Sequence, residues 1–154
     1  MGTSFVAIHQ RGFWVRDWIL ELCLRLLALH LEEPDEAERA TSPVPRIRDA
    51  WLLASRGYFN GCVPDGLEEA VRSAEGRAVV LCALGSLLQV LRRAPPSLHA
   101  GTLNLLGIEN PWSTDIETAA LVEVAQALLD LVEGRIGTDA SDASFRPGRG
   151  GSRS

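Results

Sequence analysis

Lysine is absent from this sequence of 154 residues, and all 15 basic side chains are arginines. Without lysine, Schiff-base catalysis is excluded, as is a phosphate-binding loop that depends on a lysine ammonium group. Arginine without lysine, beside abundant alanine, leucine and glycine, is typical of a GC-rich bacterial gene. The apolar share of 46% and the charged share of 23% are ordinary for a globular chain and exclude wholesale disorder.

Motifs for metals, cofactors and nucleophilic catalysis are lacking as well. The three cysteines, Cys23, Cys62 and Cys82, contain no Cys-x-x-Cys pair, and the three histidines are scattered along the chain. The sequence also has no nucleophile elbow, no Walker loop and no dinucleotide-binding glycine pattern. We therefore expect no metal ion and no cofactor, and an enzyme is the less favoured interpretation.

Positive charge is in deficit, because 20 acidic residues face 15 basic ones and the net charge is −5. This balance argues against binding to nucleic acid or to an anionic membrane surface. The first twelve residues lack the pattern of a secretory signal. The longest apolar stretch, residues 14–31, carries four charges, which argues against a membrane-spanning helix. We expect a cytoplasmic protein.

The spacing of the apolar residues predicts an all-α fold, a compact single-domain bundle of about five helices. The expected helices cover residues 13–33, 46–56, 66–75, 77–93 and 115–133. The first and fourth are apolar on most sides and are expected to form the central pair. Residues 1–12 are an N-terminal segment, 13–136 the helical domain, and 137–154 a disordered tail rich in glycine, serine and arginine.

Local signals refine these helices. Residues Thr114 and Glu117 fit a capping box at the start of the last helix, and Gly134 is its expected stop. In the first helix, Glu21 and Arg25 are spaced for an i,i+4 ion pair. Strands are weakly indicated, since only residues 4–8 and 61–63 could pair and neither segment alternates cleanly.

An acidic cluster follows the first predicted helix. Five carboxylates fall within seven residues: Glu32, Glu33, Asp35, Glu36 and Glu38. Negative charge at a helix C-terminus opposes the helix dipole, and Asp130 and Glu133 repeat this conflict at the end of the last helix. The cluster is interpreted either as a docking surface for a basic partner, with Trp112 as a further contact residue, or as a solvated loop that aids solubility.

Cys62 is the one candidate nucleophile. It lies in residues 57–66, a connector with glycines at 57, 61 and 66 that allow unusual backbone geometry. A thiol before a helix N-terminus can be activated, with a histidine brought near by the fold. The alternative is a tight turn in which the cysteine fills a gap, and no cysteine-enzyme signature surrounds it.

Three hypotheses for function remain. The first is a non-enzymatic, acidic protein-binding module that masks a basic partner. In general character such a chain is similar to bacterial immunity proteins, an analogy of size, acidity and helical pattern that no motif supports. The second is a small cysteine-dependent enzyme that uses Cys62. The third is a homo-oligomeric structural protein whose apolar helix faces continue across an interface.

Overall fold

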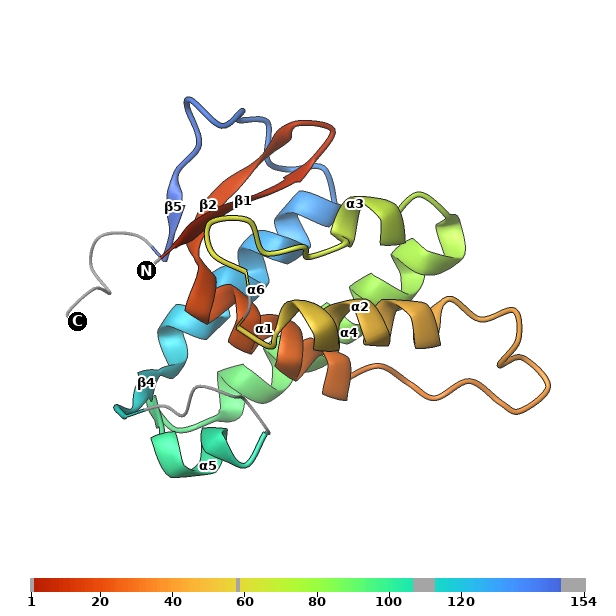
Figure 1. Cartoon of the computed structure of the whole chain (residues 1–154), viewed down its shortest axis with the longest axis horizontal. Coiled ribbons are helices and arrows are strands. Elements are labelled where there is room, and N and C mark those ends of the chain that lie inside the picture. Colours follow the sequence, from red (N-terminus) through yellow and green to blue (C-terminus); the bar gives the residue numbers. More distant parts are fainter. Residues whose placement is uncertain (1, 58, 107–112, 148–154) are drawn as a thin grey trace.

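The protein has a mixed α/β architecture, so the all-α prediction is wrong. The computed structural model describes residues 2–57, 59–106 and 113–147, and in this part of the chain six helices pack with a three-stranded and a two-stranded sheet (Figure 1). Of the described residues, 49% are in helices and 13% in strands. The expected abundance of helix is present, but the N-terminal segment is folded as part of a sheet.

Strands β1 (Thr3–Ile8) and β2 (Arg11–Arg16) form an antiparallel hairpin over residues expected to be a loose segment and the start of a helix. His9 and Gln10 make its two-residue turn, and both have positive φ, at 51° and 65°. Such turns favour Asn-Gly, so the sequence carries no recognisable hairpin signal. Phe13 and Val15 are buried against the helices, and this tertiary packing overrides the helical pattern that runs through them.

Residues 137–147, placed by the sequence in a tail, lie along β2. Strand β5 (Phe145–Arg146) pairs with it in parallel, so the sheet order is β1-β2-β5. The backbone N–H of Trp14 donates to the Ser144 carbonyl at 3.0 Å, and its indole N–H donates to the Ala140 carbonyl at 2.8 Å. The Trp14 ring also stacks on Phe145, with centroids 6.2 Å apart. Residues 148–154 lie outside the described part of the chain.

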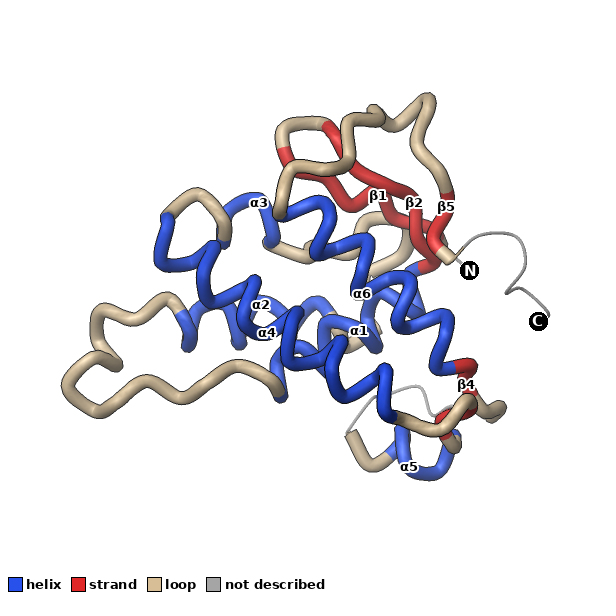
Figure 2. The backbone as a smooth tube through the Cα atoms, turned by 180° about the vertical axis from the view of Figure 1, so that it is seen from behind, coloured by secondary structure: helices blue, strands red, loops and turns tan. Residues whose placement is uncertain are grey.

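The helices form one core beneath the hairpin. Helix α1 lies at its centre and packs against helices α2, α4 and α6. The six helices of the described residues are α1 (Asp17–Leu29), α2 (Val44–Ala54), α3 (Leu67–Ala70), α4 (Ala74–Arg93), α5 (Ala100–Asn104) and α6 (Thr118–Val132). The loop between α1 and α2 stands away from this body in both views (Figure 1, Figure 2).

Several helix ends differ from the prediction. Helix α4 begins at Ala74, capped by the Ser73 hydroxyl, so Gly76 lies in its first turn instead of ending the preceding helix. The capping box before the last helix is wrong, because residues Ile116–Glu117 form strand β4, paired with β3 (Ser97–Leu98). Gly134 does end α6, with φ of 77° and its N–H bonded to the Leu131 carbonyl.

Helix α4 is the expected partner of α1, but one of its sides is open. By length and composition it could cross a membrane, a test that the core helix of a globular protein also passes. Val80, Leu84 and Leu87 are buried in the core. Gly85 faces away, and a Cβ added there would have no neighbour within 4 Å. Gly85 therefore does not contact α1, whereas the neighbouring Ser86 meets the end of that helix, with its hydroxyl 3.0 Å from His30 Nδ1.

We predict opposite effects for two glycine substitutions. Gly85→Ala is expected to raise the free energy of unfolding by ~0.5–1 kcal/mol, because alanine favours helix and the position is open. Gly12→Ala is expected to lower it, because the new Cβ would lie 1.7 Å from the Val6 carbonyl oxygen. Urea unfolding of both variants measures the difference. A loss of stability in Gly85→Ala would contradict an open helix surface.

Candidate functional site

Asp17 is a buried carboxylate that joins three segments of the chain. Only 6% of the residue is exposed. Its Oδ1 accepts a hydrogen bond from the Ser4 hydroxyl of β1 at 2.6 Å, and its Oδ2 accepts one from the Gly61 N–H at 2.6 Å. The Ser4 hydroxyl in turn accepts from the Val63 N–H at 2.9 Å. Both oxygens are thus satisfied, which a buried carboxylate requires.

A pocket of about 330 Å³ opens beside this network, between the first turns of α1 and the connector, residues 57–66. Its lining combines two carboxylates, two aromatic rings and an amide with two glycines: Gly2, Asp17, Trp18, Glu21, Gly57, Phe59 and Asn60. Gly2 has to be a glycine for this packing, since a Cβ there would lie 2.0 Å from Asp17 Oδ2 and 2.3 Å from Asn60 Oδ1. No basic side chain belongs to this lining.

Glu21 is the unusual group of the pocket. Partial burial, together with the charge of Asp17 one turn earlier, raises the pKa of Glu21 from 4.5 to about 7. The ion pair expected with Arg25 is not formed. The Arg25 guanidinium instead donates to the Leu106 carbonyl at 2.9 Å and lies 3.4 Å from the Ser55 hydroxyl. The carboxylate pair therefore lacks the cation that the sequence pattern assigned to it.

The acidic cluster lies in the projecting loop, residues 30–43, called here the acidic loop (Figure 1). All five of its predicted carboxylates are exposed. Only Glu33 is ion-paired among these five, with Arg48 of α2 at 2.6 Å. The backbone of the loop is ordered by two turns, in which the Asp35 and Glu38 carbonyls accept hydrogen bonds from residues three and four positions later. The sequence thus predicted the exposure of these charges but not their projection from the body.

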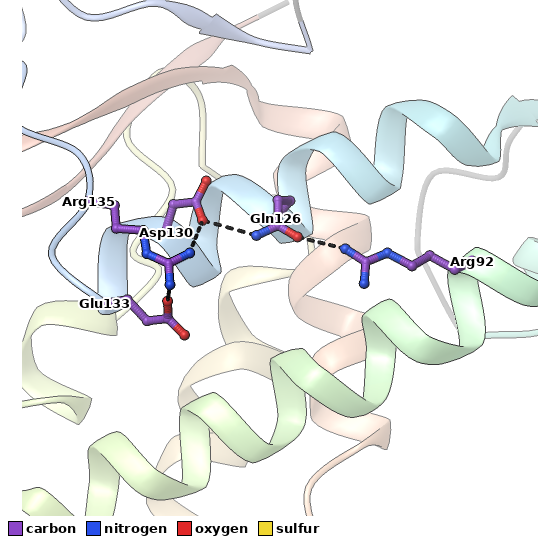
Figure 3. A network of polar contacts seen from close by, with 5 residues as sticks. All are labelled: Arg92, Gln126, Asp130, Glu133 and Arg135. Atoms are coloured by element: carbon purple, nitrogen blue, oxygen red, sulfur yellow. Dashed lines mark hydrogen bonds and ion pairs between the residues drawn. The ribbon is translucent and has the colours of Figure 1, made fainter.

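The acidic residues at the end of α6, which oppose the helix dipole, are neutralised within the fold. At the end of α6, Asp130 and Glu133 both pair with Arg135, at 3.6 Å and 2.7 Å (Figure 3). Gln126 extends the network by donating to Asp130 and accepting from Arg92 of α4. These groups fasten α6 to α4 and to the following turn, so the two acidic residues there need no functional explanation.

None of the other described candidates belongs to the pocket lining. Cys62 is exposed, and in the described part of the chain its thiol has no hydrogen bond to a histidine or to any other side chain. Cys82 is exposed on α4, whereas burial raises the pKa of Cys23 to about 12. No cluster of three potential metal ligands occurs among the described residues. Trp112 lies outside the described residues.

Sequence reasoning missed the pocket, and of its two carboxylates it singled out only Glu21, as a partner for Arg25. The four-residue spacing of Asp17 and Glu21 was visible as part of one helix stripe. The closing residues, Phe59 and Asn60, come from a connector about forty positions away, and no local pattern assigns them to α1.

Comparison with protein-family models, curated proteins and solved structures finds no match to this chain.

Glu21 is predicted to make stability depend on pH. Because its pKa is raised in the folded protein, the native state binds more protons than the unfolded chain between about pH 4.5 and 7, and stability falls as the pH rises through that range. Glu21→Gln is expected to be ~1 kcal/mol more stable than the parent at pH 8, after allowance for solvent screening, and equal to it at pH 4. Urea unfolding across this range measures the difference.

Glu36→Gln, in the exposed acidic loop, serves as the matched control. If Glu21→Gln raised the free energy of unfolding by the same amount at pH 4 and at pH 8, the effect would come from packing and not from ionisation. That result would contradict the raised pKa of Glu21.

The two exposed thiols are predicted to react in the native protein, and the buried thiol is predicted not to react. A disulfide reagent should modify Cys62 and Cys82 at similar, ordinary rates in the native protein, because no cationic side chain contacts either sulfur in the described structure. Cys23 should react only after unfolding. Rates are measured on variants that retain one cysteine each. A rate for Cys62 a hundredfold above that for Cys82 would instead support the cysteine-enzyme hypothesis.

Proposed function

We propose that this protein is a non-enzymatic binding module that engages a basic protein partner through the acidic loop, in the manner of an immunity or inhibitor protein. The observation that carries the proposal is the projection of the loop from the helical body with its carboxylates in solvent. We place this partner in the cytoplasm, where the three free cysteines fit a reducing environment.

Charge and shape support the proposal together. Glu32, Asp35, Glu36 and Glu38 form no ion pair among the described residues, so their field is not cancelled within the protein. Opposite charges on a partner would accelerate encounter and fix the orientation of docking. The two turns of the loop reduce the conformational entropy that would be lost on binding.

The alternatives have less support. The cysteine-enzyme hypothesis needs a base in contact with Cys62, and no described side chain forms a hydrogen bond with its thiol. The homo-oligomer hypothesis needs an apolar surface. The open side of α4 is uncharged around Gly85, but no second feature of the described chain identifies a copy as its occupant.

A charge-reversal variant tests the acidic loop. The partner is first captured from lysate of the source organism by the tagged protein and identified by mass spectrometry. Its affinity is then measured for the parent protein and for the variant. The double substitution Asp35→Arg and Glu36→Arg is expected to weaken binding at least tenfold at low salt, with the difference shrinking at high salt. Both residues are exposed and lack side-chain partners among the described residues, so the melting temperature should be unchanged.

The double substitution Glu69→Arg and Asp142→Arg is the control, since it alters net charge equally at exposed positions outside the loop. Equal weakening by both variants would mean that only overall charge matters. Unchanged binding by the loop variant would remove the acidic loop as the interface.

A further inference from the structure

The pocket beside Asp17 lies at the opposite end of α1 from the acidic loop, so it is a separate feature of the molecule. Asp17 begins the helix, whereas the acidic loop begins directly after its last residue, Leu29. The proposed docking of the loop gives no role to this cavity. The residues that line the pocket therefore need an explanation that does not involve the acidic loop.

Among the described residues, no ion pair compensates the charge of the pocket. Asp17 and Glu21 stand one turn apart on α1, and neither forms an ion pair with a described residue. Arg25, the nearest basic residue along the helix, is held by the Leu106 carbonyl and the Ser55 hydroxyl. The described lining residues of the connector, Gly57, Phe59 and Asn60, have no ionisable side chain. A cation that entered the pocket would supply the missing charge.

The remaining walls suit an organic cation. Trp18 and Phe59 line the same cavity as the carboxylates, and both are partly buried against the core. Aromatic faces attract ammonium and guanidinium groups, and carboxylates beside them add charge-assisted hydrogen bonds. A volume of about 330 Å³ admits such a group together with a short alkyl chain.

A divalent metal fits the site poorly. The two Asp17 oxygens already accept hydrogen bonds from Ser4 and Gly61, which leaves Glu21 as the one uncommitted carboxylate. Calcium takes six to eight oxygen ligands, and no group of three potential metal ligands occurs among the described residues. The aromatic walls would also contribute nothing to a hydrated metal ion.

We propose that this pocket is a binding site for an alkylguanidinium or alkylammonium group, held between Glu21, Asp17 and the aromatic rings of Trp18 and Phe59. The cation belongs either to a small molecule or to an arginine side chain of a protein. The chemistry of recognition is the same for both sources.

N-ethylguanidinium is the probe, and N-ethylurea is its neutral control of nearly equal shape. Titrations followed by amide NMR at pH 8, where Glu21 is ionised, should show saturable shifts for ethylguanidinium centred on residues 17–21 and 59–61, and none for ethylurea at the same concentration. Glu21→Gln should weaken binding at least fivefold, and Phe59→Leu two- to fivefold. Glu36→Gln should bind like the parent.

Two further experiments distinguish the possible sources of the cation and separate the pocket proposal from the acidic-loop proposal. Tighter binding of a blocked Gly-Arg-Gly peptide than of ethylguanidinium supports an arginine side chain, and the reverse order supports a small molecule. The variant with Asp35→Arg and Glu36→Arg should retain the site even if the loop fails as an interface. The proposal would be overturned if ethylurea caused the same amide shifts as ethylguanidinium, or if Glu21→Gln bound ethylguanidinium as tightly as the parent.

Discussion

The buried carboxylate of Asp17 is the interaction on which the arrangement of this protein depends. Its two oxygens accept from Ser4 in β1 and from Gly61 in the connector, while its own N–H donates to the Gly2 carbonyl. A buried carboxylate without partners would cost several kcal/mol, so the hairpin, α1 and the connector are constrained to meet at this point. The end of β2 and the beginning of α1 follow from this requirement.

The same constraint creates the charge imbalance of the pocket. Partial burial, together with the charge of the neighbouring Asp17, raises the pKa of Glu21. Arg25 could have neutralised it but instead ties α1 to Leu106 and Ser55. The Arg25 guanidinium thus serves the packing of the helices, and the Glu21 carboxylate remains available to a ligand.

Charge is distributed differently at the ends of α6 and α1. At the end of α6, Arg135 pairs with Asp130 and Glu133, so the unfavourable helix-end charges are answered within the fold. After α1, by contrast, Glu33 alone of the acidic cluster has an ionic partner among the described residues. The two regions look alike in sequence, and the contrast between them directs the functional proposal to the acidic loop.

The sequence by itself determined the main helices, because apolar residues at helical spacing bury one face wherever the chain packs. It also determined local stops and caps, such as Gly134 and the Asp65 carboxylate that accepts the Leu67 N–H. Only the tertiary structure decided that residues 3–16 form a hairpin, because their pairing depends on burial of Phe13 and Val15 against helices far along the chain. It likewise decided the partners of the buried carboxylate, since Asp17 accepts a hydrogen bond from Gly61, 44 positions along the chain, and no local pattern encodes that contact.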